Sequence, residues 1–196
     1  MPSTTLRELS GLDQTPAALA SSTVILVDYQ NTYTQGVMEL DGWQAALDAA
    51  VRLVARAREA GATVIHVIND GGEGGAYDIR QEIGSIHPAV APVDGEEVVV
   101  KTTPNAFNAT NLGELVDKAG NETVVIAGFM THMCVQYTAH GAFLRGNAPT
   151  VVADASATRA LPALGAEVPA AQVHAGALAV IEDLWGVVVP SVDQLG

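Results

Sequence analysis

Residues 123–138, TVVIAGFMTHMCVQYT, contain the transition that decides the fold. A short β-branched run ends at Gly128 and is followed by Thr131, a candidate N-cap, which predicts a strand, a tight turn and a helix start. Cys134, the only cysteine, would lie in the first helical turn, where free backbone N–H groups and the helix dipole stabilise a thiolate. Cys134 is therefore a candidate nucleophile, although a small buried hydrophobe explains a lone cysteine equally well.

Apolar runs and helical patterns alternate along the rest of the chain. This alternation predicts an α/β fold with a parallel sheet covered on both faces. The predicted strands are residues 23–27, 62–68, 97–101, 123–127, 150–153 and 186–189. The predicted helices are residues 41–61, 111–119 and 169–184, together with the helix opened by the cysteine turn. Asp41 and Gln44 have the spacing of a capping box at the start of the first helix.

Length and composition favour one domain. The chain has 196 residues, of which 48% are hydrophobic. This is enough for one buried core but short for two domains. We expect an N-terminal arm over residues 1–20 and a single domain over residues 21–196. The glycine-rich residues 69–96 form a long connection, interpreted as a flexible rim over a site. A single cysteine and no apolar leader predict a cytoplasmic protein.

The charge disfavours nucleic acid as a partner. The net charge is −13, from 22 acidic and 9 basic residues, so the field of the molecule opposes a phosphate backbone. Residues 123–144 carry no formal charge and are long enough to span a bilayer. They change from strand-like to helix-like character midway and include several polar side chains, so we expect no membrane partner.

Three polar side chains follow predicted strands at the same edge of the sheet. Asp28 ends the first strand, Lys101 ends the third and Cys134 follows the fourth. Ligands of open parallel sheets bind beyond the carboxyl ends of the strands. Singly, each residue could close a turn, face solvent or pack. Together, an acid, a cation and a thiol are the parts of an activated cysteine nucleophile.

The chain resembles the isochorismatase-like cysteine hydrolases, a family that includes nicotinamidases, N-carbamoylsarcosine amidase and streptothricin hydrolase. The resemblance rests on LVDYQN, KTTPNAFNATNL, AGFMTHMCVQYTA and VVADASATR, and it covers residues 23–189. It implies a three-layer α/β/α fold with a six-stranded sheet in the order 3-2-1-4-5-6. It also implies an Asp28, Lys101 and Cys134 triad, a cis peptide at Phe129–Met130, and an oxyanion hole made by the Met130 and Cys134 amides.

The resemblance implies hydrolysis of a small amide substrate through a thioester, with no cofactor and no metal. Nicotinamidases carry an Asp-x-His-x-x-His-type cluster that this chain lacks, and true isochorismatases lack the cysteine, so a streptothricin-hydrolase-like branch is favoured. His66 is interpreted as a core histidine. The predicted substrate-binding residues flank the triad motifs: Gln30, Tyr33, Phe107, Thr131 and His132. The positive mean hydropathy and the resemblance favour a homo-oligomer, a dimer or tetramer. The alternative is a non-catalytic binding or thiol redox-sensing protein on the same fold.

Overall fold

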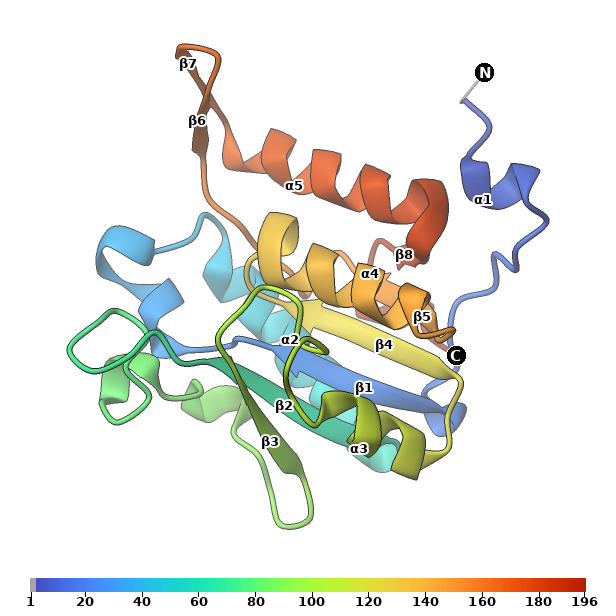
Figure 1. Ribbon diagram of the computed structural model, residues 1–196, viewed down its shortest axis with the longest axis horizontal. Helices are drawn as coiled ribbons and strands as arrows, with labels where there is room; N and C mark the ends of the chain where they lie inside the picture. Colours follow the sequence, from blue (N-terminus) through green and yellow to red (C-terminus); the bar gives the residue numbers. More distant parts are fainter. Residues whose placement is uncertain (1–2) are drawn as a thin grey trace.

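The sheet of the computed structural model, which describes residues 3–196, has six parallel strands in the order β3-β2-β1-β4-β5-β8 (Figure 1). The strands are β1 (Ser22–Val27), β2 (Thr63–Asn69), β3 (Glu97–Lys101), β4 (Thr123–Gly128), β5 (Ala148–Val152) and β8 (Val187–Val189). All neighbouring strands pair in parallel. The predicted fold and strand order are confirmed, with β8 as the sixth strand of the sheet.

α2 (Trp43–Glu59) covers one face of this sheet, and α3 (Leu112–Ala119) and α4 (Gln136–Leu144) cover the other. The remaining helices are α1 (Leu6–Leu9) and α5 (Ala170–Val180). Successive side chains of β1 alternate between the faces: Val24 and Leu26 join the core under α2, while Ile25 and Val27 join the core under α3 and α4. α5 lies outside α4 in Figure 1. Every residue of β1 is buried, as expected for a central strand covered on both sides.

Two local features differ from the predictions. The short hairpin β6 (Leu161–Ala163) and β7 (Ala166–Val168) lies in a segment with no strand-like run, and its residues have little burial to leave a pattern. The predicted capping box of α2 is wrong. The N-cap is Gly42 in a left-handed conformation, and Asp41 lies outside the helix because its N–H donates to the Thr158 carbonyl.

Gly128 ends β4 in a conformation that only glycine adopts readily. Its φ is 146°, and an added Cβ would overlap the carbonyl oxygen of Val27 on the neighbouring strand. The chain can therefore leave the sheet close to β1. No helix within residues 3–196 combines the length and the apolarity that crossing a membrane requires.

His66 is a satisfied core histidine, as interpreted from the sequence. Its Nε2 lies 2.8 Å from Glu96 Oε2, and the same carboxylate accepts hydrogen bonds from Arg58 and from the Val93 amide. Burial alone would raise the pKa of the Glu96 carboxyl, but the bonds from Arg58, His66 and Val93 outweigh it and hold the pKa at about 2.

Glu96→Gln is expected to lower the free energy of unfolding at pH 7 and to make it fall less as the pH is lowered. A carboxyl whose pKa is lowered on folding stabilises the protein above its unfolded pKa and loses that contribution as the pH falls from about 4.5 towards 2. Urea midpoints at pH 7, 4 and 3 measure this. The difference between parent and variant should shrink across that range, and a constant difference would contradict the assignment.

Candidate active site

The structure brings Asp28, Lys101 and Cys134 together at the carboxyl edge of the sheet. Lys101 Nζ lies 2.7 Å from Asp28 Oδ2 and 3.3 Å from Cys134 Sγ. Lys101 spans the distance between β3 and β1, across the intervening strand β2. Asp28 and Lys101 are 0% and 1% exposed, and Cys134 is 7% exposed. An acid, an ammonium and a thiol therefore meet in one buried cluster.

The backbone at Asp28 turns sharply as β1 ends. Asp28 has a φ of 53°, in the left-handed region where aspartate is tolerated better than most residues. Its N–H still donates to the Val67 carbonyl at 2.9 Å, which continues the pairing with β2. The chain then folds back so that the Gln30 N–H donates to the Asp28 carbonyl. This turn fixes the carboxylate at the edge of the sheet.

Cys134 lies in a wide π-helical turn, Thr131–Val135, that leads into α4. The preceding Phe129–Met130 peptide bond is cis. Thr131 is not the helix cap that the sequence predicts. Its N–H donates to the Ala157 carbonyl, and its Oγ1 lies 2.9 Å from His174 Nδ1. Both groups therefore form hydrogen bonds with residues outside this turn. The role of the Met130 and Cys134 amides as an oxyanion hole stays a prediction.

The resting charge state differs from the one expected at a helix start. Burial, and then the charge of Asp28, raise the pKa of the Cys134 thiol to about 12. The direction is opposite to the one expected at a helix start, because the Cys134 side chain itself is buried and faces a carboxylate. Burial also lowers the pKa of Lys101, but Asp28 and Cys134 outweigh it and the net direction is upward. The cluster therefore rests as a thiol beside an ion pair.

Asp28 is well placed to accept a proton. Burial raises the pKa of its carboxyl, against the opposing effect of Lys101. Apart from the ion pair with Lys101, neither carboxylate oxygen has a hydrogen-bond partner within residues 3–196. A buried carboxylate with unused acceptor capacity and a raised pKa is a stronger base than an exposed one.

The structure places the predicted substrate-binding residues unevenly. Gln30 and Thr131 are fully buried and their polar atoms bond within the protein. Tyr33 is buried with its ring 5.7 Å from that of Phe129. Phe107 is partly buried in the core under the guanidinium of Arg145. His132 is partly exposed, with Nδ1 paired to Thr158 Oγ1.

Sequence reasoning missed two residues of this site. Asn69 ends β2, the strand between Asp28 and Lys101, and its Oδ1 accepts a hydrogen bond from Lys101 Nζ at 3.3 Å. Tyr77 comes from the loop 69–96. Its ring lies 5.7 Å from that of Tyr33. Burial raises the pKa of its hydroxyl, and the charges of Cys134 and Asp28 act in the same direction. The strand-edge rule could have found Asn69, but no sequence signal marks Tyr77.

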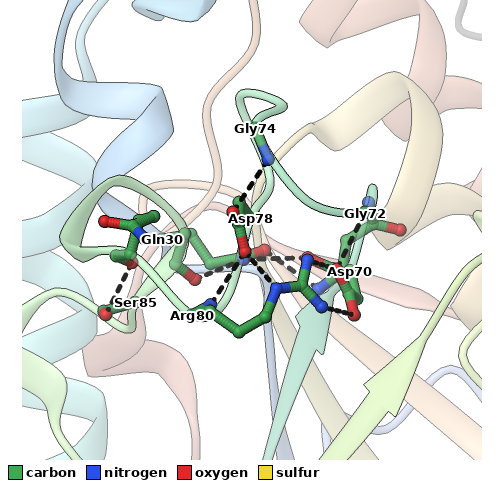
Figure 2. Close-up of polar contacts among 10 residues, drawn as sticks. Gln30, Asp70, Gly72, Gly74, Asp78, Arg80 and Ser85 are labelled. Carbon is green, nitrogen blue, oxygen red and sulfur yellow. Dashed lines mark hydrogen bonds and ion pairs between the residues drawn. The ribbon is translucent and has the colours of Figure 1, made fainter.

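Ion pairs and hydrogen bonds connect residues within the loop 69–96. Figure 2 shows Arg80 between two carboxylates of this loop: its guanidinium bonds to Asp70 at 3.1 and 3.2 Å and pairs with Asp78. The Asp78 carboxylate also accepts the amides of Gly74 and Arg80. The loop thus carries ion pairs of its own, and its flexibility stays a prediction.

Among the residues that the structure describes, Asp28, Lys101 and Cys134 are not part of a metal-ligand cluster, and they do not line the large cavity near this edge of the sheet. Within residues 3–196, no three His, Cys, Asp or Glu side chains gather as metal ligands would. A hollow of about 580 Å³ lies beyond β5, and Asp41, Thr158 and His174 are among its lining residues. Asp28, Lys101 and Cys134 are not among its lining residues.

Comparison with known proteins identifies close relatives. The profile of the isochorismatase domain family matches residues 22–189. The secreted isochorismatase effector Isc1 of Verticillium dahliae is 31% identical over 188 residues, 95% of this chain and 97% of that protein. A streptothricin hydrolase of Streptomyces noursei is 38% identical over 141 residues, 71% of this chain but 51% of that enzyme. An isochorismatase structure from Pseudomonas putida KT2440 has a TM-score of 0.96 and 36% identity, with both chains covered in full.

Proposed function

Because the chain belongs to the isochorismatase family of hydrolases, we propose that it is a cysteine hydrolase that cleaves a small amide, lactam or carbamoyl compound at its C–N bond. The observation that carries the proposal is the position of Lys101 Nζ between Asp28 Oδ2 and Cys134 Sγ. A thiol in contact with a cation, beside a carboxylate whose oxygens accept no hydrogen bond within residues 3–196, has the components of an activated nucleophile. The 38% identity with a streptothricin hydrolase favours an amide substrate.

The first half of the reaction transfers the acyl group to sulfur. Asp28 accepts the proton of Cys134 as Sγ attacks the substrate carbonyl carbon, and Lys101 stabilises the negative charge on sulfur during this step. Because the thiol pKa is high, proton removal accompanies attack and no thiolate accumulates beforehand. The tetrahedral intermediate collapses when the C–N bond breaks, and Asp28 returns its proton to the leaving nitrogen.

The second half releases the acid. Water enters the place of the departed amine, Asp28 removes one of its protons, and the resulting hydroxide attacks the thioester carbon. The C–S bond breaks, and the proton held by Asp28 restores the thiol. In both halves the Met130 and Cys134 amides stabilise the oxyanion, and one such donor contributes about 2.7–4 kcal/mol to lowering the barrier.

A product-detected screen tests this function. Amides, lactams, ureas and carbamoyl compounds are incubated with the protein, and released ammonia or amine is measured against a reaction without protein. We expect turnover of at least one class, with saturation kinetics and no requirement for added metal. Turnover that disappears with a chelator, or no turnover across all four classes, would contradict the proposal.

The redox-sensing alternative is less well supported. A sensor thiol needs a low pKa and open access to oxidants. Cys134 is 7% exposed and its pKa is raised. A homodimer or homotetramer and a cytoplasmic location stay predictions, and the fungal relative is named as a secreted effector.

A further inference from the structure

The ammonium of Lys101 has three neighbours. Nζ lies 2.7 Å from Asp28 Oδ2, 3.3 Å from Cys134 Sγ and 3.3 Å from Asn69 Oδ1. A lysine ammonium carries three N–H donors and no acceptor, and this one is sealed from water. Nζ donates hydrogen bonds to Cys134 Sγ and Asn69 Oδ1 and forms an ion pair with Asp28. Two of these neighbours belong to the proposed reaction, and the third, Asn69, has no assigned role.

We propose that Asn69 is a positioning residue, whose side-chain oxygen fixes the Lys101 ammonium between Asp28 and Cys134, and that Gln30 fixes Asn69. The catalytic consequence rests on the proposed function, whereas the geometry does not. A lysine side chain has four rotatable bonds, so a buried ammonium needs acceptors on more than one side to stay in one place. Asn69 is the uncharged acceptor among the three neighbours of the Lys101 ammonium.

Gln30 holds the main chain of Asn69 from both directions. Gln30 Oε1 accepts the Asn69 N–H at 2.9 Å, and Gln30 Nε2 donates to the Asn69 carbonyl at 3.0 Å. The same Nε2 donates to the Gly84 carbonyl at 2.7 Å, in the middle of the loop. Gln30 is fully buried, so these bonds have no competition from water. This side chain fastens the loop rather than facing a substrate.

The register of the strands and the loop ion pairs complete the support. Asn69 lies opposite Lys101 in the pairing of β2 with β3, and the next residue, Asp70, donates its N–H to the Lys101 carbonyl at 2.9 Å. Asp70 is then held by Arg80, as Figure 2 shows. The backbone on both sides of Asn69 is therefore immobilised, and its side chain can hold a fixed direction.

The neutrality of the third acceptor has a chemical consequence. A second carboxylate beside Nζ would compete with the sulfur for the ammonium and raise the thiol pKa further. An amide oxygen orients the ammonium without adding negative charge. The other titratable groups that face the cluster are Tyr33 and Tyr77, whose hydroxyls stay neutral because their pKa values are raised.

The test measures the alkylation rate of Cys134, the only cysteine, by iodoacetamide from pH 7 to pH 10. This rate depends on the thiolate fraction and does not require a substrate. Asn69→Leu removes the acceptor at similar size, and Asn69→Ala is a smaller second variant in case the first fails to fold. Asn31→Leu is the matched control, because Asn31 Nδ2 fastens the same loop through the Glu82 carbonyl without touching Lys101.

We expect Asn69→Leu to alkylate about tenfold more slowly at a given pH, which corresponds to a thiol pKa one unit higher. Asn69→Ala should fall in the same direction, and Asn31→Leu should stay within twofold of the parent, which is roughly 0.3 pKa units. With a substrate from the screen, kcat should fall about as much while KM stays nearly constant. Parent-like alkylation in both Asn69 variants, or an equal loss in Asn31→Leu, would overturn the inference. Failure of the screen alone would count against the proposed function and leave this test intact.

Discussion

Cys134→Ala is expected to reduce amide hydrolysis to the rate without protein. The proposed route forms a bond between Sγ and the substrate carbonyl carbon, and no other thiol exists in the chain to replace it. Cys134→Ser should also lose at least about 10³-fold, at the middle of the range for acid–base and nucleophilic contributions. A serine hydroxyl is a weaker acid than a thiol, and the raised pKa of Asp28 does not close that gap. The measurement is product release on the best substrate of the screen.

The control for this prediction is Tyr137→Phe. Tyr137 is about half exposed on α4, three residues beyond Cys134, and lies outside the Asp28 and Lys101 contacts. It should keep parental turnover and melting temperature. Cys134→Ala should melt close to the parent, because its loss is one buried sulfur. Residual turnover above one-tenth of the parent in Cys134→Ala would refute covalent catalysis by this cysteine.

The parallel sheet could be predicted because its strands are buried on both faces. Runs such as TVILV and TVVIA are apolar after their first threonine, so their boundaries are clear in the sequence. The hairpin of β6 and β7 left no such signal, because its residues are mostly exposed and do not need to be apolar. Capping spacing is a local rule and favours a helix start at Asp41, whereas the long-range hydrogen bond from the Asp41 N–H to the Thr158 carbonyl keeps Asp41 outside α2.

For the site too, the positions of the residues could be predicted from the sequence, whereas the electrostatic environment of Cys134 could not. Strand ends predicted that Asp28, Lys101 and Cys134 would share an edge, and the distances between them bear out that geometry. The charge state of Cys134 could not be read locally. A helix start lowers a thiol pKa in water, but burial and a neighbouring carboxylate raise it by more here. Burial depends on all the packed layers, which a sixteen-residue motif does not contain.

Lys101→Met is expected to destabilise the protein by about 3–5 kcal/mol at neutral pH and to abolish turnover. Met keeps most of the volume of the lysine stem but leaves Asp28 as a buried carboxylate with no counter-ion. Taking a proton relieves this, so the pKa of Asp28 should rise further in the variant. A carboxyl whose pKa is raised on folding contributes its stability at low pH and loses it as the pH rises. The cost of Lys101→Met should therefore shrink between pH 8 and pH 5.

The double variant Asp28→Asn with Lys101→Met separates the effect of the two charges on stability from their effect on turnover. Removing both charges together should recover a large part of the lost stability, because a neutral pair avoids the desolvation of two ions. The double variant should cost less than the sum of the two single variants by more than about 1 kcal/mol, as for groups in direct contact. Turnover should not recover, since both the base and the cation are missing. Urea unfolding of the four proteins at pH 8 and pH 5 gives the cycle. Additive costs, or a Lys101→Met penalty that grows towards low pH, would mean that Asp28 and Lys101 are not the buried ion pair on which the proposed proton transfer depends.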